Sequence, residues 1–330
     1  MKRINYTFIT GKIRYLETKL LNVVDLERMI DAPNLESAFK ILYDTDYGAH
    51  LLERKPEEFE MVILDDLLED KKLLWQFVFD KDLIKFLLLE YDFHNLKVIF
   101  KEKLYNKDLD YLLIPLGFFE PVIFKKVIID KERIKIDKEF QEIIDEANNF
   151  LKPDLHPYQI EFFFDQKYFL LLKKLAEKLK NKFIIDFVNL KLDLTNLRIF
   201  LRIKNLKRDV DFLSQALVIP GKIDINDLIN LYHQDIEKTL KYLVKFLPPY
   251  FEKYFSEYLK EKDLWLLEKR FFEAEIEYLR KAKYIAYGPE IVVAYFYAKK
   301  NANKNIRLIM SGKLNKIENE ILKGKIRALY

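Results

Sequence analysis

Apolar side chains recur along this chain at the three- and four-residue spacing that places them on one side of an α-helix. One such set lies near the N-terminus and predicts a first helix there: Ile9, Ile13, Leu16 and Leu20. The run from Phe169 to Leu179 repeats the pattern in mid-chain. Predicted helix breaks coincide with Pro or with Gly-Pro pairs, at Pro33, Pro56, Pro157, Pro248 and Gly288-Pro289.

Glycine and proline are scarce, with 7 Gly and 10 Pro in 330 residues. Sandwiches and doubly wound sheets need many turns rich in these residues, so their scarcity favours long helices and an all-α fold. The alternation of Val188, Leu190, Leu192 and Leu194 is typical of a strand. An internal repeat argues against that interpretation.

The repeat consists of an Asn, an apolar residue, a basic residue and three further apolar residues. It occurs in three copies, which begin at Asn95, Asn196 and Asn305 and carry Lys97, Arg198 and Arg307 as the basic residues. The copies lie about a hundred residues apart, which is the size of a small domain. In the first two copies an Asp precedes the Asn by three residues, and a turn with Pro and Gly follows, at 113–117 and 218–221.

This periodicity predicts three tandem, related helical bundles, at residues 1–120, 121–225 and 226–330. The segment around Asn196 is then helical like the other two copies. An Asn inside a helix is unfavourable unless its amide satisfies backbone groups or a neighbouring helix. We therefore interpret the three Asn residues as structural locks between helices rather than as ligand-binding groups.

Charge and composition exclude several classes of function. The 57 basic and 53 acidic residues nearly balance, so even the Lys-rich stretch 299–304 gives no case for a nucleic-acid partner. The chain has no Cys, which excludes disulfides, thiol nucleophiles and Cys-ligated zinc. Charged residues interrupt every apolar stretch before it reaches the length of a membrane-spanning helix.

One acidic run, Asp65-Asp66-Leu67-Leu68-Glu69-Asp70, is a candidate for metal chemistry. Asp65, Asp66 and Glu69 could hold magnesium bound to a diphosphate, as the aspartate-rich box of all-helical isoprenoid synthases does. The alternative is a solvated acidic helix face, because a second complete metal box is missing. The four His residues show no metal-ligand spacing, and the Gly-Lys pairs lack the rest of a phosphate-binding loop. No catalytic, cofactor-binding or metal residue is therefore assigned.

Taken together, the motifs resemble those of the C-subunit family of archaeal and bacterial V/A-type rotary ATPases, whose eukaryotic homologue is the d-subunit of the V-ATPase. The opening helix is similar to the family's Tyr-x-x-Ala-Arg-x-Arg segment, although Gly11 and Lys12 stand where Ala and Arg are usual and Phe8 replaces Tyr. The matching segments follow one another in the family's order, at residues 8–21, 42–47, 92–97, 193–198, 287–295 and 305–313.

The resemblance implies a non-catalytic rotor subunit without cofactors. It implies a funnel of three helical domains, peripheral on the cytoplasmic face of the membrane, with the central axle subunits (D and F) in its mouth and the membrane proteolipid rotor ring beneath it. Such a subunit transmits torque for proton or sodium transport. A helical-repeat adaptor or scaffold protein shares the same sequence features and stays open as the alternative, ahead of the isoprenoid synthase.

Overall fold

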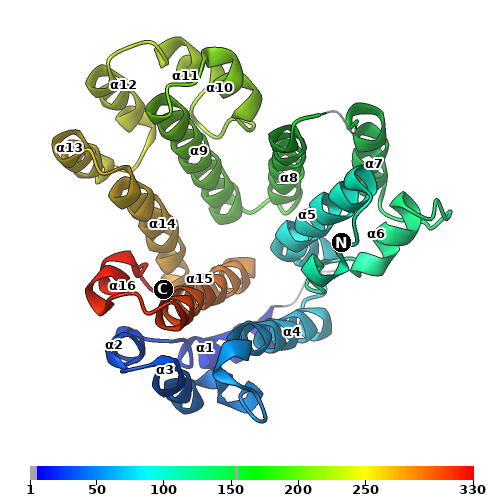
Figure 1. Cartoon of the computed structure of the whole chain (residues 1–330), viewed down its shortest axis with the longest axis vertical. Coiled ribbons are helices and arrows are strands. Elements are labelled where there is room, and N and C mark those ends of the chain that lie inside the picture. The colour runs from blue at the N-terminus through cyan, green and yellow to red at the C-terminus, as the bar shows by residue number, and fades with distance from the viewer. Residues whose placement is uncertain (1–5, 153–154) are drawn as a thin grey trace. The chain divides into compact units, whose positions relative to one another are not determined.

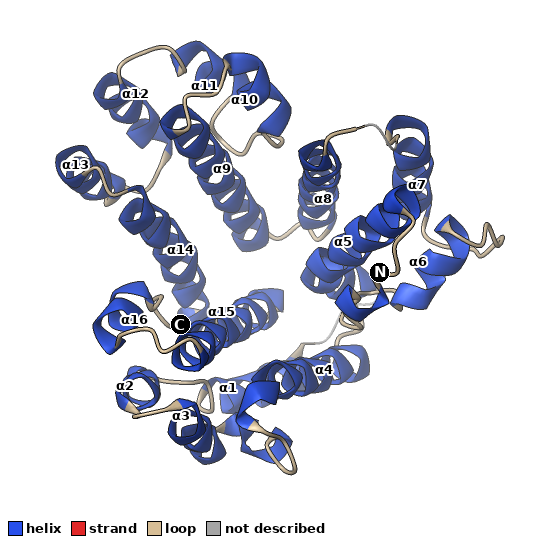
Figure 2. Ribbon diagram, viewed as in Figure 1, coloured by secondary structure: helices blue, strands red, loops and turns tan. Residues whose placement is uncertain are grey.

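The computed structural model is built of helices and loops (Figures 1 and 2). It describes residues 6–152 and 155–330, and within these residues it contains sixteen α-helices, six short 3-10 helices and no strand. The predicted all-α fold is confirmed. No helix in the described ranges combines the length and the apolar character that crossing a membrane requires.

The chain divides into two compact units. Unit 1 comprises residues 1–81 and 269–330, and so joins the two ends of the chain. Its elements are α1 (Thr7–Glu17), α2 (Val23–Asp31), α3 (Leu35–Ile41), η1 (Leu42–Asp44), η2 (Asp46–His50), η3 (Pro56–Glu58), α4 (Phe59–Phe77), most of α14 (Leu264–Arg280), η6 (Lys281–Tyr284), α15 (Pro289–Leu314) and α16 (Asn319–Lys325).

Unit 2 comprises residues 82–268. Its elements are α5 (Lys81–Tyr105), η4 (Asp110–Leu112), α6 (Pro121–Ile128), α7 (Lys138–Phe150), α8 (Pro157–Lys178), α9 (Lys182–Asn205), α10 (Val210–Ala216), α11 (Ile225–Leu231), α12 (Ile236–Leu243), η5 (Val244–Phe246), α13 (Phe251–Glu261) and the start of α14. The division into three bundles with boundaries near 120 and 225 stays a prediction.

Helices begin where the sequence carries start signals. Pro56, Pro157 and Pro289 each occupy the first turn of a helix, where a missing N–H costs nothing. Asn22 caps α2 in a reciprocal capping box with Asp25, whose backbone N–H it accepts at 3.1 Å. The first helix ends at Glu17, so Leu20 of the predicted apolar face lies in the turn that follows.

Helix ends explain the scarcity of Gly. Many helices stop with a left-handed residue, a position that Gly usually occupies. Here Lys180, Lys207, Lys262 and Lys316 take it, with φ between 52° and 56°. After α9 the N–H of Arg208 donates to Ile203 at 3.2 Å, which completes a Schellman motif around Lys207.

Each unit packs around a helix that is buried on several sides. In unit 1 this is α15, which contacts α1, α3, α4 and α16 (Figure 1). In unit 2, α9 buries the alternating residues Val188, Leu190, Leu192 and Leu194. The prediction that this segment is helical is therefore confirmed, and its strand-like alternation results from burial on opposite sides of the helix.

Candidate functional site

The repeated Asn residues bind backbone. On α5, Asn95 Nδ2 donates to the Ile114 carbonyl at 2.8 Å and its Oδ1 accepts from the N–H of Ile114 at 2.9 Å. On α9, Asn196 Oδ1 accepts from Val218 N–H at 2.9 Å, and Nδ2 donates to the carbonyls of Val218 at 3.3 Å and Ile219 at 3.2 Å. The side-chain amide thus pairs with a peptide unit of the loop that follows its helix.

The third copy repeats this geometry with the C-terminal segment. On α15, Asn305 Nδ2 donates to the Arg327 carbonyl and Oδ1 accepts from Arg327 N–H, both at 3.0 Å. A second amide on the helix, Asn301, donates to Ala328 at 2.7 Å. All three repeated Asn residues are buried. Their partners are loop backbone groups, whereas the sequence interpretation expected a neighbouring helix.

An Asp three residues before the Asn extends the first two pairings. Asp92 accepts from Phe118 N–H at 2.9 Å and Phe119 N–H at 3.0 Å. Asp193 accepts from the N–H groups of Lys222 and Ile223, each at 2.9 Å. We call each Asp-x-x-Asn set and its loop a helix-to-loop clamp. The third copy has Ala302 in place of the Asp and therefore lacks the carboxylate.

Burial and hydrogen bonding act on Asp193 in opposite directions. Desolvation raises the pKa of the Asp193 carboxyl to about 6, while the two backbone N–H donors stabilise its anion and lower the pKa. The signal that identifies this residue in the sequence is the Asp-x-x-Asn spacing, which both copies share.

Two of the three basic residues of the repeat pair with a neighbouring helix. Lys97 Nζ contacts Glu161 at 2.9 Å and Asp165 at 2.6 Å, both on α8. Arg307 Nε contacts Glu60 on α4 at 2.8 Å. Arg198 occupies the equivalent place on α9 and is half-buried. In two copies, then, the base forms an ion pair with a neighbouring helix of its own unit.

The acidic run on α4 does not assemble as a metal box. Asp65 pairs with Arg54 at 2.9 Å. Glu69 is largely exposed and lies 3.7 Å from His50. Asp66 points to the interior instead. The three candidate magnesium ligands are therefore directed to different neighbours.

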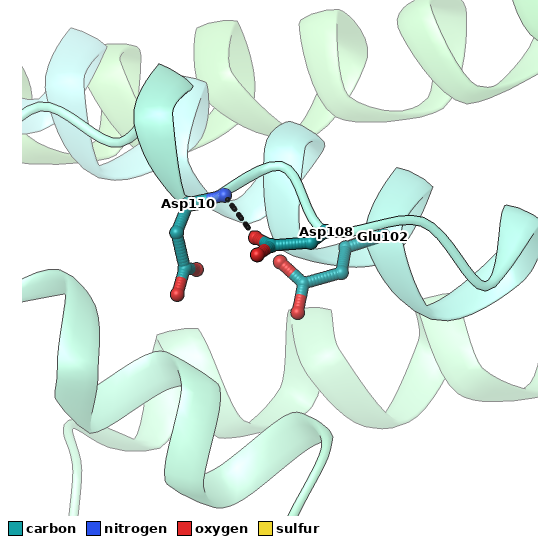
Figure 3. A group of neighbouring side chains, drawn as sticks. All are labelled: Glu102, Asp108 and Asp110. Atoms are coloured by element: carbon teal, nitrogen blue, oxygen red, sulfur yellow. Dashed lines mark hydrogen bonds between the residues drawn. The ribbon is translucent and has the colours of Figure 1, made fainter.

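The carboxylates of Glu102, Asp108 and Asp110 are the one group in the described part of the chain close enough to share a cation (Figure 3). Lys125 already bridges two of them, at 2.9 Å from Glu102 and in contact with Asp110. Asp110 also donates its backbone N–H to Asp108 at 3.0 Å. In this cluster Asp108 and Asp110 are exposed, Glu102 is partly buried, and Lys125 supplies the counter-ion.

A buried charge cluster in unit 1 was missed by the sequence analysis. Lys299 on α15 is 2% exposed, and its Nζ lies 2.7 Å from Asp66 and 3.4 Å from Asp46. On the same face of α4, Asp70 accepts from the hydroxyl of Tyr295 at 3.0 Å. The expectation of a solvated acidic face is therefore wrong for Asp66 and Asp70, which are 5% and 7% exposed.

The other half of the cluster ties η2 to α15. Tyr47 donates its hydroxyl to Asn303, and the Lys299 ammonium lies 4.7 Å from the centre of the Tyr47 ring. Burial raises the pKa of Asp66 and Asp70, and for Asp70 the value reaches about 7. The Lys-rich stretch at 299–304 thus begins in the core: Lys299 and Lys300 are both buried.

Comparison with known proteins identifies the family. The sequence profile of the ATP synthase (C/AC39) subunit family matches residues 9–325. The chain belongs to this family. It is 23% identical to the C-subunit of the V-type sodium ATPase of Enterococcus hirae, across 99% of each chain. It is also 23% identical to the C-subunit of the A-type ATP synthase of Thermococcus kodakarensis, over 96% of this chain and 89% of the relative.

A further relative, the C-subunit of the A-type ATP synthase of Methanocaldococcus jannaschii, is 24% identical over 98% of this chain and 86% of its own length. These relatives are therefore similar from end to end rather than over one shared segment. The resemblance that the sequence motifs indicated, to the C-subunit family of V/A-type ATPases, is confirmed.

Proposed function

We propose that this chain is the non-catalytic rotor subunit that couples the central axle to the membrane rotor ring of a V/A-type ATPase or ATP synthase. The observation that carries the proposal is the family match over residues 9–325, which covers nearly the whole chain. In this role the subunit transmits torque that drives, or is driven by, proton or sodium transport.

The demands of this role are mechanical. Moving one charge through 100 mV is worth about 2.3 kcal/mol, so a coupling subunit must lose little of that energy to internal deformation. Packed helices that are tied to their loops by buried clamps, in a chain with 7 Gly, suit this task. The helix-to-loop clamps are accordingly assigned to rigidity and not to ligand binding.

The proposed partners are the axle subunits (D and F in the family) and the proteolipid ring. Attachment is through these partners on the cytoplasmic face of the membrane. A stable seat requires an interface of roughly 1,000 Å² or more with each partner. A helical-repeat adaptor would need the same rigidity but would bind other proteins.

The test is an affinity purification of the tagged full-length chain from gently solubilised membranes, with mass spectrometry of the bound proteins. Recovery of the axle subunits together with the proteolipid supports the rotor role. The control is the same purification with the untagged chain. If the ATPase subunits are present in the membranes but absent from the bound fraction, the rotor proposal is wrong and the adaptor alternative gains support.

The absence of catalysis has its own test. Phosphate release from ATP by the purified chain should not exceed the buffer rate. The Asp65→Asn variant is the comparison, because Asp65 belongs to the acidic run that most resembles a catalytic box and, unlike Asp66, is not buried in the core. Steady turnover by the wild type that disappears in this variant would contradict a non-catalytic subunit.

A further inference from the structure

The buried charge cluster of unit 1 contains more acid than base. Lys299 contacts two carboxylates, Asp66 and Asp46, and is the cation at the centre of the cluster. Asp70 has no cation of the described residues within ion-pair distance, and its Oδ1 is held by the neutral hydroxyl of Tyr295. A buried anion without a counter-ion is strongly unfavourable, so the three acids cannot all be charged at low cost.

Of the three acids, Asp70 has the fewest neighbouring groups that stabilise its charged form. Its Oδ2 is buried and has no hydrogen-bond partner among the described residues, so only one of its two oxygens is satisfied. Asp66 Oδ2 is also without a partner there, but the Lys299 ammonium lies 2.7 Å from Asp66 Oδ1 and neutralises its charge. Asp46 is one-third exposed and can be solvated. Protonation of Asp70 is therefore the least costly way to neutralise the cluster.

The groups that face this carboxyl come from three elements. Asp46 lies on η2, Asp66 on α4, and Lys299 with Tyr295 on α15. His50 on η2 also acts on Asp66, where its charge would favour the anion. The positive charge of Arg307 likewise favours the anion of Tyr47 and so opposes the rise that burial causes in the pKa of its hydroxyl. Apart from Lys299, none of the described groups that face Asp70 supplies it with a positive charge.

We propose that this cluster is a proton-binding site, in which Asp70 carries a proton in the folded protein and releases it when the 3-10 segment at residues 42–58 detaches from α4 and α15. The proposal goes beyond the rotor function and does not depend on it. The detaching segment consists of η1, η2, η3 and their loops, and Asp46 and Tyr47 of η2 contact Lys299 and Asn303 on α15.

The direction of the pH effect follows from proton linkage. Burial raises the pKa of folded Asp70 to about 7, above the ordinary value of 3.8, so the folded form binds the proton more tightly than the open form. The stabilisation is fully present below about pH 4 and is lost as the pH rises to about 7. Between these values the open fraction rises by up to about tenfold per pH unit, and above pH 7 it is level.

Hydrogen exchange of the full-length chain, followed by mass spectrometry from pH 4.5 to 8.5 and corrected for intrinsic exchange, measures this fraction in peptides from residues 42–58. In the wild type, the open fraction should rise with pH up to about pH 7 and stay level above it. Asp70→Asn should lose the part of the rise that Asp70 contributes and keep only the part that comes from Asp66, whose pKa burial also raises, because the amide keeps an acceptor for Tyr295 and does not titrate. The matched control is Glu60→Gln, because Glu60 is an exposed carboxyl of the same helix whose partner, Arg307, lies outside residues 42–58; it should keep the wild-type profile.

A wild-type profile that is level, or an Asp70→Asn profile with the wild-type slope, would overturn the proposal. If Asp70→Asn does not fold, Tyr295→Phe provides a second test of the same proposal. The Tyr295 hydroxyl stabilises the anion of Asp70, so its removal should shift the plateau to higher pH. A purely structural contribution of Tyr295 would raise exchange equally at every pH, and that result would also count against the proton site.

Discussion

Gly221 lies directly against Asp193. A Cβ added at Gly221 would stand 2.5 Å from Asp193 Oδ1 and would also overlap the Asn189 carbonyl. We expect Gly221→Ala to lower the free energy of unfolding by about 1–3 kcal/mol, because the added methyl group forces the loop away from the carboxylate that holds it. Chemical denaturation followed by circular dichroism measures the loss.

Gly11 supplies the matched control. It lies on α1, and a Cβ built there meets nothing within 4 Å. Gly11→Ala should stabilise the chain by about 0.5–1 kcal/mol, since Ala is the better helix former. Equal effects of the two substitutions would show that the close approach at Gly221 does not matter.

Replacing a clamp Asn should lower stability. In Asn196→Leu the N–H of Val218 and two loop carbonyls lose their partner, and Asn95→Leu does the same to Ile114. Each should cost about 1–3 kcal/mol, because buried backbone groups are left unpaired. Asn149→Leu, at an exposed position on α7, controls for the added apolar surface. Unchanged melting with lost partner binding would make the repeated Asn residues contact residues instead.

Removing the buried cation Lys299 should lower the free energy of unfolding more than replacing a clamp Asn does. Lys299→Met leaves Asp66 buried without its counter-ion, and we expect a loss of about 3–5 kcal/mol. The double variant Lys299→Met/Asp66→Leu should recover much of it, since replacing both members of a buried pair is often neutral. Lys304→Met, at an exposed position of the same helix, should change little. Additive losses in the double variant would argue that the pair is not coupled.

A left-handed Lys should be improved by Gly. Lys207 has φ 52° at the end of α9, a conformation that costs an L-residue about 1–2 kcal/mol. Part of the gain is offset by the greater freedom of Gly in the unfolded chain, so Lys207→Gly should raise the free energy of unfolding by roughly 0.5–1 kcal/mol. Lys174→Gly, in the exposed interior of α8, should lower it by about 1 kcal/mol.

The fold was predicted from sequence patterns that span only a few residues. The helical spacing of apolar residues, the prolines in first turns and the repeated Asn all act over a few residues, so one sequence is enough to interpret them. The repeat also indicated which loops matter: the Pro- and Gly-containing turns at 113–117 and 218–221 are the segments that receive Asn95 and Asn196. That these turns bind the Asn directly was not predicted, because loop length does not fix where a loop returns.

The buried charge cluster could not be predicted from such short-range patterns. Asp66 and Asp70 have the composition of a solvated helix face, but their partners in the core, Lys299 and Tyr295, lie more than two hundred residues further along the chain. Nothing near Asp66 distinguishes it from Asp65, which pairs with Arg54. The side of α4 that faces the core is decided by tertiary packing, and one sequence does not record it.

The assembly of unit 1 from the two ends of the chain sets an order of events during synthesis. Helices α1 to α4 leave the ribosome long before α15, the helix on which they pack. Unit 2 is complete first, while Ile9, Ile13 and the neighbouring apolar residues of unit 1 still lack their cover. These early helices are the segments that a nascent-chain chaperone would hold. Translation that stops before α15 would leave a product in which unit 2 is folded but helices α1 to α4 are not packed.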